Sequence, residues 1–270
     1  MQTGAVTVVG SVFYAWRIEP HWVEFTSRSL PISGLPASLQ GANLVQLSDI
    51  HVGRFVDSAY LVDVMQRVSS LAPEIVVITG DFVTHTGSEV IDELGRVLER
   101  VPHGSRRTVA VLGNHDYGRG RPRERIARAV AQRADDAGIS LLRNSIVDVD
   151  GLRIVGLDDL WSRNFDPEPA LQQLRPDDAA LVLSHNPDAV DGHVWGEYNG
   201  WILSGHTHGG QVKPPLLPPP FLPVRNHRYS AGEYDLGDGR FMYVNRGIGH
   251  SMRIRFNARP EVTVFRLQRA

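Results

Sequence analysis

The sequence contains no cysteine. Disulfides, thiolate-bound zinc and a cysteine nucleophile are therefore excluded, and any metal must be held by histidine, carboxylate, amide or water. The chain also lacks a marked excess of charge of either sign. It has 28 Lys and Arg residues and 30 Asp and Glu residues, which gives a formal net charge of -2. This balance provides no general attraction to nucleic acid or to an anionic membrane surface. We expect no stable nucleic-acid partner.

The sequence has few long apolar runs. AVTVVGSVFYAW, residues 5–16, is about half as long as the roughly 20 residues that a membrane-spanning helix needs. No Lys or Arg precedes it, as one would in a signal peptide. We divide the chain into an N-terminal apolar segment, residues 1–20, and a single domain, residues 21–270. The segment is interpreted either as a surface strand or short helix, or as an interfacial segment or the stub of a membrane anchor.

The first half of the chain alternates strand and helix patterns, which indicates an α/β fold with buried strands. Runs rich in Val, Ile and Leu predict strands over residues 42–48, 74–80 and 108–114. Apolar residues at helical spacing predict helices over residues 58–71, 88–101 and 123–138, the last ended by Gly138. The second half is rich in strands: two Asp-Gly hairpins lie within 145–159 and 232–249, and single strands within 179–187, 200–210 and 261–268.

Five short polar clusters occur where predicted strands end. They are Asp49-Ile50-His51, Gly80-Asp81, Gly113-Asn114-His115-Asp116, Ser184-His185-Asn186 and Gly205-His206-Thr207-His208-Gly209. In open α/β sheets, ligands bind at the carboxyl ends of the strands, so five such ends can bring these groups together. Each cluster alone has a simpler explanation, such as an ion pair, a turn or a surface loop. All five in this order favour a common site.

The residue types in the clusters suit a pair of divalent metal ions. Carboxylates and imidazoles bind Mn, Fe or Zn, and the carbonyl of Asn114 adds a neutral oxygen ligand. Asp81 can bridge two ions through its two oxygens. The sequence does not decide between the metals, although manganese is the ion with which we would begin. Of the remaining histidines, three are interpreted as surface or capping residues (His21, His103, His193) and three are left undecided (His85, His227, His250).

The order D-x-H, G-D, G-N-H-D, H and G-H-x-H resembles the calcineurin-like metallophosphoesterase superfamily. The tail YSAGEYDLGDGRFMYVNRGIG, preceded by GHTHGGQV, resembles the bacterial phosphodiesterase branch of that superfamily, whose members often carry an N-terminal membrane anchor or export signal. The resemblance implies two facing β-sheets sandwiched between helices. It also implies a protein that is cytoplasmic or peripheral to the bacterial inner membrane, with a peripheral membrane contact.

The resemblance also implies a role for each cluster residue. One ion would be held by Asp49, His51, Asp81 and His208, and the other by Asp81, Asn114, His185 and His206. Asp81 would bridge the two ions. His115 would not be a ligand, but would lie next to the phosphate as a general acid or as a stabiliser of developing charge.

The implied activity is that of a phosphodiesterase or pyrophosphatase, in which a metal-bridging hydroxide attacks phosphorus in line. The substrate would be a small phosphoester or a nucleotide-linked lipid. A phosphomonoesterase with the same site is the main alternative, and a non-catalytic metal-binding interaction module is another. Asp158 and Asp159 are candidates to orient a metal-binding histidine. Trp161, Phe165 and Phe221 are interpreted either as an apolar lip for the substrate or as ordinary packing.

Overall fold

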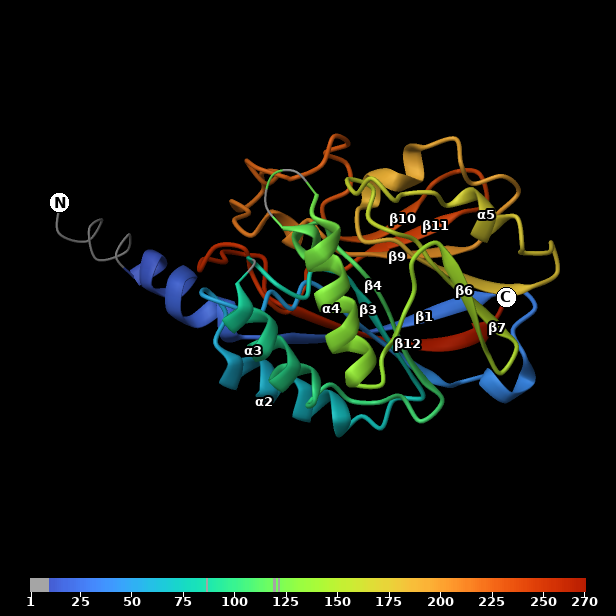
Figure 1. The fold of residues 1–270 in the computed structure, drawn as a ribbon. Helices are drawn as coiled ribbons and strands as arrows, with labels where there is room; N and C mark the ends of the chain where they lie inside the picture. The colour runs from blue at the N-terminus through green and yellow to red at the C-terminus, as the bar shows by residue number, and fades with distance from the viewer. Residues whose placement is uncertain (1–9, 86, 119, 121) are drawn as a thin grey trace.

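In the computed structural model, which describes residues 10–85, 87–118, 120 and 122–270, two six-stranded sheets face each other (Figure 1). The first sheet contains, in spatial order, β1 (Glu24–Ile32), β12 (Glu261–Arg269), β2 (Asn43–Leu47), β3 (Ile75–Thr79), β4 (Arg107–Val111) and β5 (Ser140–Leu141). The second contains β10 (Gly232–Asp235), β11 (Phe241–Val244), β9 (Trp201–Ser204), β8 (Ala179–Leu183), β7 (Leu152–Gly156) and β6 (Ser145–Val149).

Three amphipathic helices cover the outer face of the first sheet: α2 (Ser58–Ser69), α3 (Ser88–Leu98) and α4 (Glu124–Asp136). The Asp57 side chain caps α2 by accepting from the Ala59 amide at 2.9 Å. Gly138 follows α4 at φ +69°, which confirms the predicted stop. Short helices complete the fold: α5 (Glu168–Leu171), η1 (Tyr14–Ile18), η2 (Glu19–His21), η3 (Ala37–Leu39), η4 (Asn114–Tyr117), η5 (Pro187–Asp191) and η6 (His208–Gly210).

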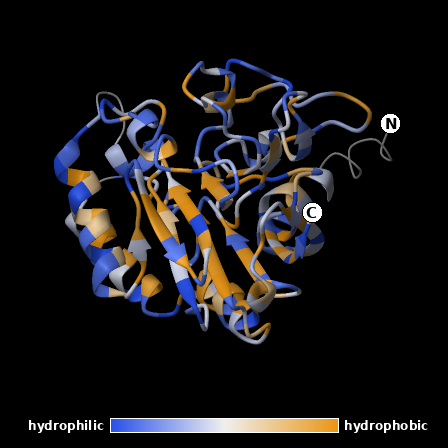
Figure 2. Ribbon diagram, turned by 90° about the vertical axis from the view of Figure 1, so that its right-hand side faces the viewer, coloured by the Kyte–Doolittle hydropathy of each residue, from blue (hydrophilic) through white to orange (hydrophobic). Residues whose placement is uncertain are grey.

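The apolar core lies in three layers. One cluster fills the space between the two sheets, one lies between the first sheet and its helices, and one covers the outer face of the second sheet. Central strands contribute to two layers at once, since Leu44 of β2 packs between the sheets and Val45 packs under the helices. Figure 2 shows strands of the sheets largely in the apolar colour, whereas the helices carry both apolar and polar residues. The predicted fold class, two facing sheets between helices, is confirmed.

The direction of the strands determines where their polar loops meet. β2, β3 and β4 are parallel neighbours in the first sheet, and β8 and β9 are parallel neighbours in the second. The Gln46 side chain links the two sheets just below their carboxyl ends, donating to Thr79 Oγ1 at 3.0 Å and to the Ser204 carbonyl at 2.9 Å. Five strand ends therefore meet at one edge of the molecule.

The N-terminal segment falls partly outside the described residues, because the structure describes it only from residue 10 onward. Residues 10–13 are helical and continue into the π-helical turn η1. Phe13 and Trp16 are exposed, whereas Ala15 is buried and its carbonyl accepts from the Arg255 amide at 2.9 Å. Among the described residues, no helix has the length and apolar character needed to cross a membrane.

Candidate metal centre

The backbone turns sharply where the predicted ligands lie. Five of the seven have a positive φ, between 51° and 73°: Asp49, His51, Asp81, His206 and His208. Non-glycine residues rarely adopt this conformation, and when they do it is commonly at a functional site. Each turn directs a polar side chain inward from the end of a strand.

Glycines beside these turns let the loops approach one another. A Cβ atom on Gly113 would overlap Asp81 Oδ1, and a Cβ on Gly205 would overlap Ser48 Oγ. The loop that carries Gly113 can therefore lie directly against Asp81 only because Gly113 lacks a side chain. The loop that carries Gly205 lies against Ser48 and Asp49 for the same reason.

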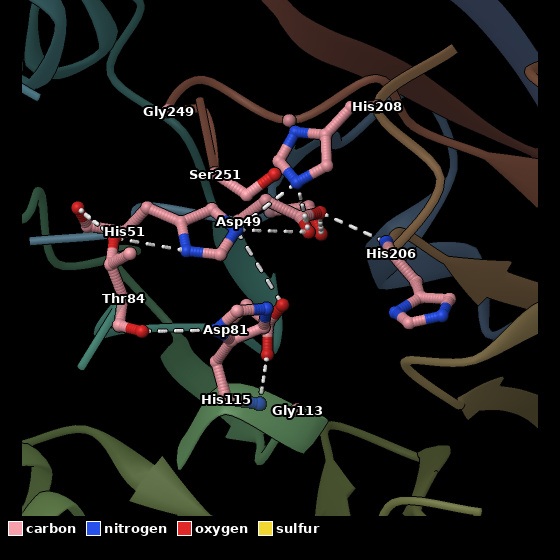
Figure 3. A network of polar contacts seen from close by, with 12 residues as sticks. Asp49, His51, Asp81, Thr84, Gly113, His115, His206, His208, Gly249 and Ser251 are labelled. Carbon is pink, nitrogen blue, oxygen red and sulfur yellow. Dashed lines mark hydrogen bonds and ion pairs between the residues drawn. The ribbon is translucent and has the colours of Figure 1, made fainter. Parts of the chain in front are cut away.

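The first group of candidate ligands comprises Asp49, His51 and His208 (Figure 3). The two imidazole Nε2 atoms lie 3.0 Å apart, and Asp49 Oδ1 lies 3.3 Å from that of His208 and 3.8 Å from that of His51. Asp49 is fixed through its other oxygen, which accepts from Ser48 Oγ at 2.6 Å and from the His206 amide at 3.0 Å. Asp49 Oδ1 has no hydrogen-bond partner among the described residues.

The second group comprises Asp81, His185 and His206, with Asn114 beside them. His185 Nε2 lies 3.1 Å from His206 Nδ1, 3.2 Å from Asn114 Oδ1 and 3.3 Å from Asp81 Oδ2. The side chains of His185 and His206 are buried. The structure thus brings all seven predicted ligands to one place, in two adjoining groups.

Asp81 lies between the two groups. Its Oδ1 accepts from the His115 amide at 2.8 Å, while its Oδ2 lies 3.5 Å from His51 Nε2 and 3.3 Å from His185 Nε2. The sequence suggested a bridge through both carboxylate oxygens. In the structure a single oxygen faces both groups, because the other is occupied by a backbone amide.

Three of the four histidines in the two groups have one ring nitrogen held by an oxygen acceptor. His185 Nδ1 lies 2.7 Å from the Thr79 carbonyl and His206 Nε2 lies 2.7 Å from the Pro223 carbonyl. A carbonyl can only accept, so these nitrogens carry the proton. His51 Nδ1 lies 3.3 Å from Thr84 Oγ1, whose own proton goes to the His51 carbonyl. In the neutral imidazoles, the nitrogens that face the centre of the site therefore present lone pairs.

This arrangement fits a pair of divalent cations. Each group places two imidazole nitrogens and a carboxylate oxygen within 4.8 Å of one another, and the buried Asp49 Oδ1 has no partner among the described residues. A buried carboxylate oxygen without a partner is unfavourable unless a cation lies beside it. In metal-binding histidines, the ring nitrogen that does not bind the metal commonly has an oxygen partner, which fixes the orientation and the tautomer of the ring.

His208 is held by a buried arginine. Its Nδ1 lies 3.2 Å from Arg255 Nη2, a nitrogen that also lies within hydrogen-bond distance of the carbonyls of Arg246, Gly247 and Gly249. Arg255 Nη2 carries only two N–H protons for these four acceptors, and its distance to His208 Nδ1 is the longest of the four. Arg255 therefore braces the loop that supports His208 without determining its tautomer.

Burial and neighbouring charges shift the titration of these groups. Burial raises the pKa of Asp49 to about 6 and lowers the pKa of His206 to about 3. Burial also lowers the pKa of His51 and His208 well below the usual range. Burial would lower the pKa of His185 too, but the Asp81 carboxylate outweighs it and raises that pKa. Neutral imidazoles are the form that binds metal, so the buried His51, His206 and His208 are preorganised for it.

His115 lies at the rim of the two groups. Its Nδ1 donates to the Thr84 carbonyl at 3.0 Å, so Nε2 is the nitrogen left to exchange a proton with a ligand. Its ring meets that of His51 edge to face at 4.9 Å, and it lines a cavity of about 300 Å³ with Asn114, Tyr117 and Asp159. Next to it, Asp116 accepts from the Gly113 amide at 2.8 Å and from the Val83 amide at 3.1 Å, which ties two loops of the site together.

Several supporting residues were not predicted from the sequence. Thr84 contacts both His51 and His115, and Arg255 supports His208, yet neither lies in a polar cluster of the sequence. Neither Asp158 nor Asp159 has a hydrogen bond to a histidine among the described residues, so their interpretation as orienting groups is not supported. Of the histidines left undecided, His250 is buried, His85 is half-buried and His227 is exposed.

Comparison with known proteins gives consistent matches. The model of the calcineurin-like phosphoesterase family matches residues 42–210, which include all five polar clusters. The chain is 33% identical to the uncharacterized metallophosphoesterase YkuE of Bacillus subtilis, over 99% of this chain and 93% of that one.

Some of the relatives carry names that specify a substrate or an activity. Identity is 30% to the UDP-2,3-diacylglucosamine pyrophosphatase LpxG of Chlamydia trachomatis, over 96% of this chain and 95% of that one. The chain is 31% identical to the phosphodiesterase YaeI of Escherichia coli, over 99% of this chain and 97% of that one. The matches span nearly the whole of each protein and agree with the paired histidine and carboxylate groups at the strand ends. The chain therefore belongs to the calcineurin-like phosphoesterase family.

Proposed function

We propose that the protein hydrolyses phosphodiesters or pyrophosphates with two divalent metal ions held at this centre. The observation that carries the proposal is Asp81 Oδ2, which lies within 3.5 Å of a histidine Nε2 in each of the two ligand groups. A carboxylate oxygen between two sets of imidazole nitrogen and oxygen donors is suited to joining two cations. The proposal takes residues 21–270 as one catalytic domain, since both sheets supply ligands.

The proposed ligands follow the two groups. Asp49, His51 and His208 hold one ion, Asn114, His185 and His206 hold the other, and Asp81 contacts both. Mn, Fe and Zn all suit this mixture of imidazole and oxygen donors, and cellular supply decides among them. When bound, the two ions supply water of lowered pKa and neutralise the charge of a phosphate.

In this proposal His115 holds the proton that the leaving group needs. Its Nδ1–H is fixed by the Thr84 carbonyl at 3.0 Å, so its Nε2–H is aimed from a rigid ring. Its backbone amide also positions Asp81 Oδ1. Protonation of a leaving oxygen by a positioned imidazole is general-acid catalysis.

The relatives favour a diester or pyrophosphate over a monoester. Two relatives that match nearly the whole chain are named a phosphodiesterase and a pyrophosphatase of a nucleotide-linked lipid. We propose that the substrate belongs to this chemical class, a small phosphodiester or a nucleotide-linked lipid. The same two ions would serve a monoesterase, so the choice is made by experiment.

Hydrolysis of bis(p-nitrophenyl) phosphate and of p-nitrophenyl phosphate, measured side by side, tests this choice. The protein is stripped with a chelator and reloaded with Mn²⁺ before the assay. We expect the diester to have the larger kcat/KM. A larger value for the monoester would replace the proposed activity by that of a phosphomonoesterase. Two bound ions per chain without turnover of either ester would favour a non-catalytic binding module.

We also propose a peripheral membrane contact through exposed apolar side chains of residues 12–22. This N-terminal patch comprises Val12, Phe13, Trp16, Ile18 and Trp22. Arg17 lies over the ring of Trp16 at 5.1 Å, and such pairs of aromatic and basic side chains suit the membrane interface. The backbone beside the patch bonds to Arg255, which in turn contacts His208, so a lipid surface here would lie near the metal centre.

Sedimentation with phosphatidylglycerol vesicles tests the membrane contact. We expect the parent protein to pellet with the vesicles and the double variant Phe13→Ser, Trp16→Ser to remain in the supernatant. Leu71→Ser, at an exposed position outside the patch, is the matched control and should pellet like the parent. Equal pelleting of all three proteins would contradict the proposed contact.

A further inference from the structure

We infer that Asp159 selects substrates by accepting a hydrogen bond from a ring-bearing group in the cavity beside His115. The ligand class is a phosphoester whose organic group carries an N–H or O–H donor on a ring, as in a nucleobase or a sugar. The inference rests on the proposed function, because it concerns the substrate of the same site.

The cavity has a volume of about 300 Å³ and adjoins the metal centre, since Asn114 and His115 form part of its wall. Asp159 and Trp161 form another part. Asp159 is 1% exposed, and its Oδ1 accepts from the Trp161 amide at 2.9 Å. Its Oδ2 is buried and has no hydrogen-bond partner among the described residues. Buried carboxylate oxygens are nearly always paired, so this one points to a missing partner.

The loop that carries Asp159 is held rigidly by its neighbour. The Asp158 carboxylate bonds to the Tyr117 hydroxyl and accepts from Arg143 Nε at 2.9 Å and from the Asp159 amide at 2.8 Å. Arg143 is itself paired with Glu124 at 2.6 Å. The unpaired oxygen of Asp159 is thus preorganised, which is what a binding group needs and a flexible surface carboxylate lacks.

Trp161 gives the cavity an aromatic wall. Trp161 is 43% exposed, and its ring meets the ring of His206 edge to face at 4.8 Å, so the side chain lies against the metal centre and is also open to a ligand. Trp161 and Asp159 line the same cavity, so a flat ring lying on Trp161 would have Asp159 beside it. Stacking tolerates many rings, whereas the acceptor at Asp159 requires a donor on the ring.

The charge of the site indicates why the partner is a donor and not a phosphate oxygen. A carboxylate repels the anionic phosphate, and burial with little access to water makes an unpaired acceptor costly. Burial raises the pKa of Asp159 to about 7, so the ionised acceptor is the main form above neutral pH. An N–H or O–H from the substrate supplies the bond that water supplies in solution.

Three esters with the same leaving group test the inference. They are bis(p-nitrophenyl) phosphate, which has no donor, the p-nitrophenyl ester of thymidine monophosphate, and that ester methylated on the imide nitrogen. The variant Asp159→Asn puts an amide donor in place of the unpaired acceptor. Asp166→Asn, at an exposed position of the same loop region, is the matched control, and Asp159→Ser serves as a second variant should the first fold poorly.

We expect Asp159→Asn to lower kcat/KM for the thymidine ester about 10- to 100-fold, the range of a hydrogen bond to a charged group, and to leave bis(p-nitrophenyl) phosphate within about twofold. If methylation of the imide reproduces this loss in the parent, the donor is the base. If methylation has no effect while the variant still loses the thymidine ester selectively, the donor is a sugar hydroxyl. Equal changes for all three esters, or none, would overturn the inference.

Calorimetric binding of thymidine monophosphate to the Mn²⁺-loaded protein separates this inference from the proposed function. If the parent hydrolyses none of the esters, the proposed function fails. The inference still stands if the nucleotide binds the parent about 10- to 100-fold more tightly than it binds Asp159→Asn. It fails if the two affinities are equal.

Discussion

Replacing Asp81 with alanine is expected to remove the bound metal and the activity together. Asp81 Oδ2 lies between His51 Nε2 at 3.5 Å and His185 Nε2 at 3.3 Å, so its loss takes a ligand from both ions at once. Loss of a residue that only orients a metal ligand lowers the metal affinity roughly 10- to 100-fold. Loss of a shared ligand should exceed this and leave the chain without stably bound ions.

The measurement is metal content per chain after dialysis, together with diester turnover. Asp63→Ala is the matched control, because Asp63 is an exposed carboxylate that forms only a weak pair with Arg67 at 4.0 Å. The control should retain the metal and the activity of the parent. Full occupancy in the Asp81 variant would show that the ligands have been assigned wrongly.

Replacing His115 with alanine should give the opposite combination, with metal retained and turnover lost. The side chain touches the ligand His51 by ring packing, and its Nδ1 donates to the Thr84 backbone carbonyl, so its removal leaves every proposed ligand in place. Its contribution to Asp81 comes from the backbone amide, which alanine preserves. Removal of a general acid typically slows a reaction about 10²- to 10⁴-fold, so we expect a loss of turnover in this range.

The leaving group distinguishes acid catalysis from a general disturbance of the site. An alkyl leaving group needs a proton more than p-nitrophenolate does, so the His115 variant should lose more activity on an alkyl diester. His103→Ala, at an exposed position, should behave like the parent. A His115 variant as active as the parent would remove this residue from the mechanism.

Much of the fold could be predicted because its central strands are buried on both faces. The predicted strand over residues 42–48 corresponds to β2 (Asn43–Leu47), and the pattern of 3.6 residues per turn in 58–71 corresponds to α2 (Ser58–Ser69). β1 (Glu24–Ile32) was missed. It is an edge strand with exposed Ser and Arg side chains and contains Pro31, so it carries no apolar period. It is a strand because it pairs with β12, more than 200 residues away.

The candidate site was predictable for a related reason. Ligand types that follow parallel strands meet at one sheet edge, and the seven predicted residues do lie together there. What holds them could not be predicted. The acceptors for His185 and His206 are backbone carbonyls, which every residue has, and no pattern of side chains indicates which ones lie near.

Arg255 illustrates the same limit. It is fully buried, and burial lowers its pKa to about 10, yet it lies in none of the five polar clusters of the sequence. Its place beneath His208 follows from loops that meet only in the folded chain. Thr84 is similar, since its role depends on contacts with His51 and His115, which lie on different loops.

The most direct test of a two-metal phosphoesterase is the number of metal ions per chain measured in parallel with diester turnover as Mn²⁺ is added back to the stripped protein. We predict that bound metal rises to two ions per chain and that hydrolysis of bis(p-nitrophenyl) phosphate reaches its maximum only as the second ion binds. Saturation at one ion per chain with full activity, or full activity without any bound metal, would contradict the shared role of Asp81 between the two histidine groups.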